Sequence, residues 1–270
     1  MLSLDSNPAT LRRLGLNHGG YHGETVDMAS LVRTIVREAQ ALGWKLEELS
    51  FGAGELLPAL HWRPDQVERR FYFSTGMHGD EPAGPLAIQA LISGNHFPSD
   101  AECWVLPCLN PSGFALNQRE NRDGLDLNRD FLNPKTPEVK ALTTWLRDKG
   151  RFDCAVCLHE DWESQGFYIY AVNPRRLPCL SESIIEAVKP VFPIDPSSEI
   201  EGLPAVQGVI TPPANPLGRD IWPETLYLTQ HHTDLGYTFE TSSDYPLDSR
   251  IHAHVVAVRA LLDRIPKSSL

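Results

Sequence analysis

The sequence predicts an α/β fold built on a largely parallel sheet. Short apolar runs with the character of buried strands alternate along the chain with segments of helical periodicity. The 270 residues are enough to bury a substantial core, and nothing in the composition divides them, so 1–270 is expected to be one domain. Ligands of such sheets bind at the carboxyl ends of the strands, so the residues that follow each strand are the first candidates for a site.

The first half of the chain supplies the elements that surround its most informative motif. Apolar residues in 26–42 recur at helical spacing, and Gly43 stops that helix. The run 71–75 has the pattern of a buried strand, and the segment 82–93 begins with a proline, as helices favour in their first turn. The elements predicted here are a helix over 26–42, strands over 45–51, 58–62 and 71–75, a helix over 82–93 and a strand over 101–107.

The second half of the chain begins with a long polar stretch, 114–134. We expect it to be a working loop, because loops of this length in compact domains usually carry function. Residues 193–223 are rich in proline and are expected to be irregular, with one short strand at 206–211. The other predicted elements are a helix over 136–149, strands over 152–159 and 166–172, a helix over 179–191, a strand over 236–243 and a closing helix over 248–265.

The charge balance limits the classes of partner. Lys and Arg number 24 against 35 Asp and Glu, a formal net charge of −11 that argues against nucleic acid or an anionic membrane as a main partner. The first 20 residues carry charges and a proline where a signal peptide needs an apolar run, and no stretch is long enough to span a bilayer. We therefore expect a cytoplasmic protein with neither nucleic-acid nor membrane partners.

The cysteines agree with a reducing compartment. Five cysteines, an odd number in a chain of this length, do not form a disulfide framework. Cys154 and Cys157 have CxxC spacing, yet they lie in an apolar predicted strand, where positions three apart face opposite sides. We therefore interpret both as core residues and not as a redox or zinc pair.

A histidine and a carboxylate lie three residues apart shortly after the predicted strand 71–75. His78 and Glu81 occupy the turn between that strand and the next helix, and Gly76 and Gly79 let the backbone bend there. Imidazole and carboxylate are ligands that suit zinc. Two ligands make half of a site, and an HxxE pair alone also arises by chance on solvated loops.

Two later residues can complete such a site. His159 ends one predicted strand and Glu240 another, and a parallel sheet brings both to the edge where His78 and Glu81 lie. Taken singly, His159 is also compatible with a satisfied histidine and Glu240 with a surface carboxylate. Together, two histidines and Glu81 leave a fourth zinc position open, which is typical of a catalytic site with one Zn²⁺ per chain. Glu240 then serves as general base and acid.

Two arginines of the polar loop 114–134 suit the charges of amide hydrolysis. A guanidinium such as that of Arg119 can stabilise the oxyanion that forms when an amide carbonyl is attacked. Asn128 and Arg129 together form a fork that matches a substrate carboxylate. Loop arginines are usually solvated, so spacing alone leaves these roles open.

Several motifs of this chain together resemble the zinc carboxypeptidase family related to carboxypeptidase A. The motifs are HGDE at 78–81, NPSG at 110–113, RENRDGLDLNRDF at 119–131, His159 at a strand end and YTFE at 237–240. The match extends from about residue 70 to 265, and the first 60 residues add nothing to it. The resemblance implies a single-domain, three-layer α/β/α fold with a mixed, largely parallel twisted sheet.

The resemblance also implies a role for each motif residue. His78, Glu81 and His159 bind zinc, Glu240 is the general base, Arg119 polarises the scissile carbonyl, and Asn128 and Arg129 bind the terminal carboxylate of the substrate. Arg122 competes with Arg119, because this loop is shorter than in the digestive enzymes. We prefer Arg119, since short bacterial members such as murein peptide amidase carry a similar RxNxxGxDLNR string.

Other residues near the motifs remain without an assigned role. The family uses a mobile tyrosine, and no motif decides among Tyr227, Tyr237 and Tyr245. The acidic residues after His159, in the string HEDWE, either receive a substrate amine or form a solvated loop. His18 and His22 lie in a glycine-rich segment and are more often surface residues than ligands.

Two enzymatic functions and one binding function remain open at this point. The leading expectation is a zinc carboxypeptidase that hydrolyses the last amide bond of a small peptide with a free carboxylate, for example a cell-wall peptide. The alternative is an N-acyl amino acid amidohydrolase similar to succinylglutamate desuccinylase and aspartoacylase. Those relatives more often carry NPxA and a VEVG-like strand, so NPSG and YTFE favour the peptidase. The third hypothesis is a domain that binds peptide or metal without turnover. The presence of Glu240 argues against it, because an inactive member would be expected to lose the general base first.

Overall fold

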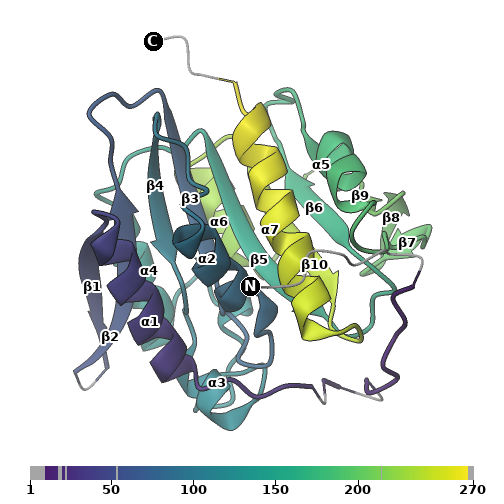
Figure 1. The fold of residues 1–270 in the computed structure, drawn as a ribbon, viewed down its shortest axis with the longest axis horizontal. Coiled ribbons are helices and arrows are strands. Elements are labelled where there is room, and N and C mark those ends of the chain that lie inside the picture. The colour runs from purple at the N-terminus through teal and green to yellow at the C-terminus, as the bar shows by residue number, and fades with distance from the viewer. Residues whose placement is uncertain (1–9, 18–19, 22, 53, 214, 267–270) are drawn as a thin grey trace.

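The computed structural model describes residues 10–17, 20–21, 23–52, 54–213 and 215–266. His18 and His22 lie outside the described residues. In the described part of the chain ten strands form one sheet in the order β1-β2-β4-β3-β5-β10-β6-β9-β8-β7 (Figure 1). The strands are β1 (Lys45–Phe51), β2 (Glu55–Trp62), β3 (Arg69–Thr75), β4 (Ala101–Leu106), β5 (Cys154–Asp161), β6 (Tyr168–Val172), β7 (Glu199–Ile200), β8 (Leu203–Val206), β9 (Val209–Ile210) and β10 (Gly236–Ser242).

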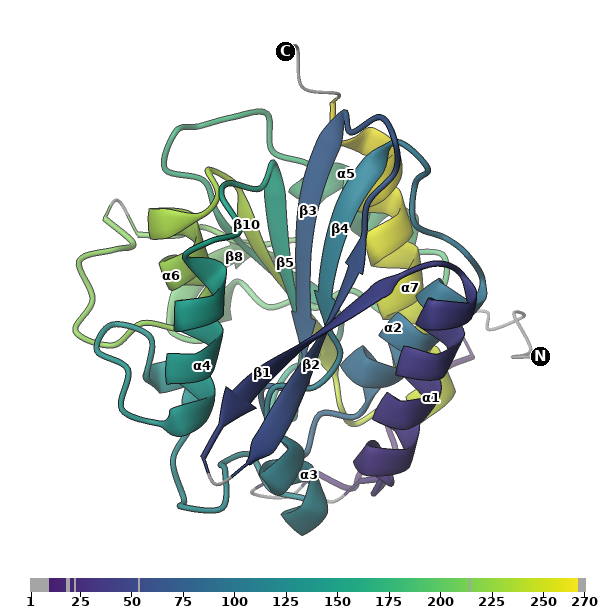
Figure 2. The same ribbon diagram turned by 90° about the vertical axis from the view of Figure 1, so that its left-hand side faces the viewer.

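The helices cover both faces of this sheet, which gives the predicted three-layer α/β arrangement (Figure 2). α1, α2, α5 and α7 pack on one face, and α4 and α6 pack on the other. The helices are α1 (Met28–Ala41), α2 (Ala83–Ser93), α3 (Pro111–Leu116), α4 (Pro137–Leu146), α5 (Ser181–Val188), α6 (Glu224–His231) and α7 (Leu247–Arg264), with a 3₁₀ turn at Leu127–Arg129. No helix among the described residues is long and apolar enough to cross a membrane.

Parallel pairing is concentrated at the centre of the mixed sheet. β4, β3, β5 and β10 run parallel to one another, whereas β1, β2 and β6 pair antiparallel to their inner neighbours. The four central strands therefore deliver the residues that follow them to one edge of the sheet, as the sequence predicts.

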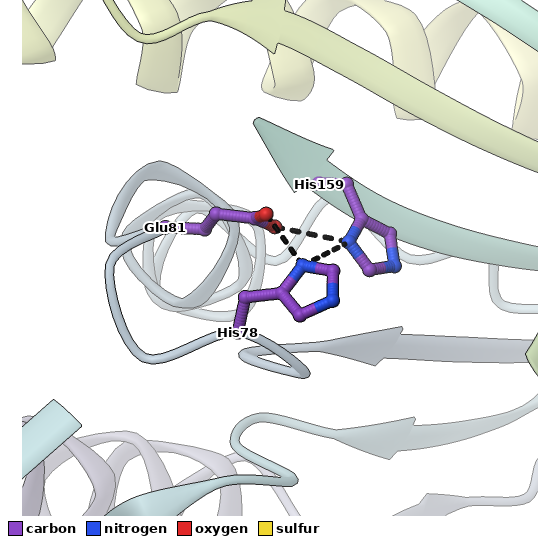
Figure 3. A group of neighbouring side chains, drawn as sticks. All are labelled: His78, Glu81 and His159. Atoms are coloured by element: carbon purple, nitrogen blue, oxygen red, sulfur yellow. Dashed lines mark hydrogen bonds and ion pairs between the residues drawn. The ribbon is translucent and has the colours of Figure 1, made fainter. Parts of the chain in front are cut away.

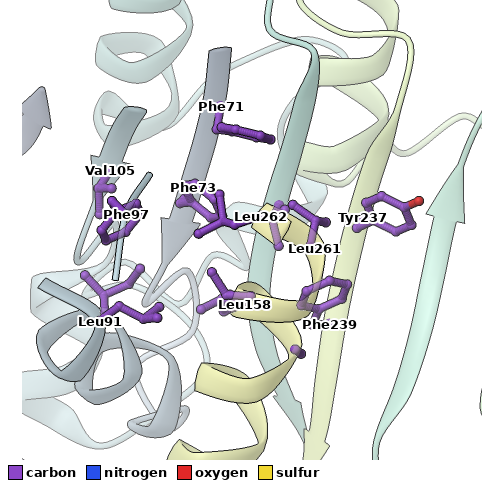
Figure 4. Close-up of a cluster of buried hydrophobic side chains, with 14 of the residues drawn as sticks. Phe71, Phe73, Leu91, Phe97, Val105, Leu158, Tyr237, Phe239, Leu261 and Leu262 are labelled. Carbon is purple, nitrogen blue, oxygen red and sulfur yellow. The ribbon is translucent and has the colours of Figure 1, made fainter. Parts of the chain in front are cut away.

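The two faces of the sheet bury separate apolar clusters. The larger cluster lies beneath α1, α2, α5 and α7, and Figure 4 shows Phe73, Leu158 and Phe239 from neighbouring strands meeting Leu261 of α7 there. Each such side chain contributes roughly 1.5–3 kcal/mol when it leaves water. The smaller cluster, which includes Leu142 of α4, lies on the opposite face. Together they hold the central strands rigidly from both sides.

Cys154 and Cys157 belong to different clusters, which confirms their interpretation as core residues. Cys154 lies in the larger cluster and Cys157 in the smaller one, on opposite faces of β5. Both thiols are free and buried, and burial raises their pKa well above the usual value. Both thiols therefore behave as small apolar side chains of the core.

Three local predictions need correction. The polar stretch 114–134 is not one loop, because it contains the end of α3 and the 3₁₀ turn, which Asp126 caps through the amide of Asn128 at 2.9 Å. The strand expected at 206–211 is a hairpin of β8 and β9, because Gln207 and Gly208 both have positive φ, as a two-residue turn requires. α6 follows the proline-rich region, where the sequence predicts no helix.

Candidate metal centre

The turn after β3 is held against the NPSG segment by close backbone contact. Gly76 has φ +63°, and a Cβ on Gly79 would meet the carbonyl carbon of Gly113 at 1.9 Å. Asn110 fixes the contact, since its side chain donates to the Met77 carbonyl at 3.2 Å and accepts from the Gly113 amide at 2.9 Å. The NPSG motif therefore shapes the turn that carries His78 and Glu81.

The three sequence-predicted ligands converge, although they come from the β3–α2 turn and the end of β5 (Figure 3). His78 Nδ1 lies 2.5 Å from Glu81 Oε1, and His159 Nδ1 lies 2.9 Å from Glu81 Oε2. The two Nδ1 atoms are 3.3 Å apart. All three residues are buried, and one potential ligand atom from each lies within 4.8 Å of the others. This donor set, two imidazoles and a carboxylate, fits a zinc ion.

Asp126 contacts the distal ring nitrogen of His78 and so supports the three candidate ligands. It accepts a hydrogen bond from His78 Nε2 at 3.2 Å, which leaves Nδ1 of that ring directed at Glu81. A carboxylate behind the distal nitrogen of a histidine ligand fixes its tautomer and orientation. Burial favours the protonated acid, but His78 and Arg119 outweigh it and hold the pKa of Asp126 well below its usual value.

Arg119, which the sequence suggests as the residue that polarises the carbonyl, lies beside the three converging side chains. Its Nε donates to Asp126 Oδ2 at 2.9 Å, and its Nη1 lies 3.6 Å from Glu81 Oε1. Burial opposes its charge, while Glu81 and Asp126 raise the pKa of the guanidinium. Arg122 points elsewhere, since it is exposed and forms an ion pair with Glu55 at the start of β2.

Glu240 lies next to His159 across the β5–β10 pair. The two residues are register partners in parallel strands, so their side chains leave the same face of the sheet. Glu240 Oε2 is buried and has no hydrogen-bond partner among the described residues. Burial, and then the nearby charge of Glu81, raises the pKa of Glu240 well above that of a free glutamate. Such an unsatisfied carboxylate is suited to accept a proton.

Further carboxylates stand near Glu240. Asp161, at the end of β5, and Glu201, in the β7–β8 turn, both raise the pKa of Glu240 through their charge. Burial raises the pKa of Asp161 itself to about 6. The wall of the site around Glu240 is therefore acidic.

Asn128 and Arg129 lie on the 3₁₀ turn that Asp126 caps. Asn128 Oδ1 accepts the backbone N–H of Glu224 at 2.8 Å, which fixes the orientation of the side-chain amide of Asn128. Arg129 is exposed, and its Nη1 donates to the Asn128 carbonyl at 3.1 Å. Glu224 is anchored in turn, since it accepts from Tyr72 at 2.6 Å and from Ser74 at 2.7 Å.

The three candidate tyrosines make different contacts. Tyr227, on α6, packs against Phe131 with ring centroids 5.8 Å apart. The hydroxyl of Tyr237 accepts the Leu180 amide at 2.9 Å, and that of Tyr245 donates to a backbone carbonyl. Tyr168, which the sequence does not single out, is the register partner of Glu240 on β6.

Some residues that shape the site escape prediction from sequence. Asp126 stands within the quoted DLNR string, and its position directly before a turn is the signal of a capping residue. The sequence leaves Glu160, like its acidic neighbours, either as a substrate contact or as a solvated residue, but its side chain is fully buried against Arg250 of α7. No local pattern announces Glu224 or Arg250, because each acts on residues distant in sequence.

Comparison with known proteins confirms the predicted resemblance. Carboxypeptidase SOL1 of Arabidopsis thaliana is 35% identical over 120 residues, which are 36% of this chain and 24% of that protein. Murein peptide amidase A of Escherichia coli (strain K12) is 30% identical over 97 residues, 35% of this chain and 40% of that protein. The chain thus spans less than half the length of these curated relatives. A family model described as a protein of unknown function (DUF2817) matches residues 57–144.

Solved structures share the fold over most of the chain. A candidate metallopeptidase from Shewanella amazonensis superposes with a TM-score of 0.78 at 24% identity and covers 96% of this chain and 99% of that one. A metallo-carboxypeptidase from Pseudomonas aeruginosa, in complex with (2-guanidinoethylmercapto)succinic acid, gives 0.64 at 19% identity and covers 88% and 69%. The chain therefore has the carboxypeptidase-like α/β fold.

Proposed function

We propose that this protein is a zinc-dependent carboxypeptidase that hydrolyses the C-terminal amide bond of a small peptide. The observation that carries the proposal is the convergence of His78, Glu81 and His159, with Glu240 in register beside His159 and its Oε2 buried without a hydrogen bond to any described residue. The peptidase and amidase names of the homologous proteins support the same class of reaction.

The residues of the site divide the chemistry among them. His78, Glu81 and His159 would hold one zinc ion, which supplies Lewis-acid charge to water and to the scissile carbonyl. Glu240 takes a proton from the attacking water and passes it to the leaving amine. Arg119, beside Glu81, stabilises the negative charge that develops on the carbonyl oxygen.

The free carboxylate of the substrate anchors it in the proposed site. The NH₂ group of Asn128, whose amide is oriented by Glu224, and the exposed guanidinium of Arg129 offer donors of the kind a terminal carboxylate accepts. A cell-wall peptide is one such substrate, by likeness to murein peptide amidase A. An N-acyl amino acid also has a free carboxylate and is the substrate of the alternative function.

A substrate panel tests the class. Zinc-loaded protein is incubated with short peptides, with the same peptides carrying C-terminal amides, and with N-succinyl and N-acetyl amino acids, and released amino acids are quantified. We expect release only from peptides with a free carboxylate. Cleavage of the N-acyl amino acids alone would establish the alternative function. Zinc binding without turnover of any compound would favour a binding module.

Arg129→Lys should raise KM for free-carboxylate peptides by about 10- to 100-fold with little change in kcat. A lysine is a point charge and cannot reproduce the bidentate fork, and a hydrogen bond to a charged group is worth about 1.5–3 kcal/mol. The measurement is steady-state kinetics on the best substrate of the panel. Arg122→Lys, in an exposed arginine paired with Glu55, is the control. An unchanged KM would remove Arg129 from the carboxylate role.

A further inference from the structure

Arg250, on α7, is a fully buried arginine that the proposed chemistry does not use. Its side chain is 0% exposed, and its Nη1 pairs with Glu160, whose side chain is also 0% exposed. Its Nη2 pairs with Glu24 in the segment before α1. An ion pair so far from water gains little over apolar packing, so it calls for a reason other than stability.

The position of Glu160 supplies that reason. Glu160 directly follows His159 on β5, and alternation along the strand directs the two side chains to opposite faces of the sheet. His159 lies on the side of the sheet where His78 and Glu81 converge, whereas the side chain of Glu160 lies between the sheet and helices α2 and α7. Glu160 therefore connects the back of the metal centre to the helices.

The second carboxylate oxygen of Glu160 reaches the other half of the metal centre. Glu160 Oε1 accepts the backbone N–H of Ala83 at 2.7 Å, at the first residue of α2. Pro82, the residue before that helix, provides no side-chain cap. Because Ala83 lies two residues after Glu81, this one hydrogen bond joins the chain neighbours of Glu81 and His159.

We infer that Arg250 is a positioning residue for the metal centre. Arg250 holds the Glu160 carboxylate in place, so that the turn carrying Glu81 and the strand carrying His159 are locked together before metal binds. The inference rests on the proposed zinc site. Glu24 and Tyr21 form the outer part of the lock, since Tyr21 donates to Glu24 Oε2 at 2.8 Å and its ring lies 6.0 Å from the Arg250 guanidinium carbon. The segment before α1 thereby contributes to a site at the sheet edge.

Arg250→Met should weaken zinc binding by about 10- to 100-fold, the usual effect of losing a residue that orients metal ligands. Methionine fills much of the space, but it leaves Glu160 buried without a counter-charge, so the carboxylate no longer keeps its place on Ala83. The readout is the zinc Kd, measured by competition with a chelating dye, together with Tm. Glu24→Gln, at the partly exposed end of the lock, should give a smaller loss in the same direction.

Two controls separate positioning from general stability. Arg69→Met breaks another arginine–carboxylate pair, the part-buried Arg69 with Asp100 at 2.5 Å, at the end of β3 remote from the turn. It should lower Tm and leave the zinc Kd unchanged. The double variant Glu160→Gln with Arg250→Met keeps an acceptor for Ala83 and removes the buried charge at position 160, and the Glu24 carboxylate that it leaves without Arg250 is 37% exposed. Its Kd should therefore return close to the wild-type value.

The outcomes distinguish this inference from the proposed function. Wild-type protein that fails to bind zinc overturns both. Wild-type binding with an unchanged Kd in folded Arg250→Met, or a Kd that the double variant does not restore, rejects the positioning role and leaves the proposed function standing. If Arg250→Met does not fold, an unchanged Kd in Glu24→Gln rejects the role in the same way.

Discussion

Replacing Glu240 by glutamine is expected to lower kcat by about 10²- to 10⁴-fold, the usual contribution of a general base, while zinc binding is retained. Glutamine has the shape of glutamate but cannot accept the proton of the attacking water. Because Glu240 makes no hydrogen bond through Oε2 to any described residue, the substitution breaks no contact of that oxygen that the fold needs. The measurement is kcat and KM on the best substrate, with zinc content determined on the same preparation.

Glu201→Gln is the matched control for this result. It removes a carboxylate whose charge acts on Glu240 but which sits in the exposed β7–β8 turn. We expect it to change kcat by a few-fold at most. Wild-type turnover in Glu240→Gln would exclude the general-base role, and an equal loss in both variants would show that only the summed negative charge matters.

His159→Ala is expected to reduce zinc from one ion per chain to a small fraction of that value, and activity should fall with it. Two remaining ligands rarely hold zinc, because the ion requires three or four protein donors at fixed positions. Zinc content is measured by elemental analysis after dialysis. Added zinc should also raise the Tm of the wild type and not that of the variant, since only a bound ligand stabilises the folded state.

His231→Ala is the control for a loss of zinc that is unrelated to the proposed site. His231 is an exposed histidine at the end of α6, and its ring lies near the Trp222 ring, 6.5 Å between centroids. It should keep full zinc occupancy. Full occupancy and activity in His159→Ala would reject the ligand assignment.

The convergence of His78, Glu81 and His159 was predictable because it follows from the way parallel strands pair. Buried strands are visible as apolar runs, and parallel pairing then places residues after β3, β5 and β10 at one edge. The register that pairs His159 with Glu240 is harder to predict, because it depends on the shift of one strand relative to its neighbour. In this chain both residues lie near the carboxyl ends of their strands, so the coarse rule was sufficient.

The supporting residues were not predictable for a physical reason. Glu160 and Arg250 are 90 residues apart, and a charged residue in sequence looks solvated until its partner is known. α6 was missed because it is a short helix next to a proline-rich segment, and Glu224 with it. The choice among the candidate tyrosines stays open for a similar reason: closeness in sequence to Glu240 says little about closeness in space, and the hydroxyl of Tyr237 accepts the amide of Leu180.

The contact between Gly79 and Gly113 limits how this protein can vary. A side chain on Gly79 would overlap the backbone of the NPSG segment, and one on Gly113 would meet Asn110 at 2.5 Å. Position 79 therefore cannot accept a larger residue unless the NPSG segment moves, and position 113 cannot unless Asn110 moves. The two glycines, 34 positions apart in the sequence, are both expected to resist substitution. Mutational libraries aimed at new specificity should leave this pair untouched and diversify residues that face the substrate.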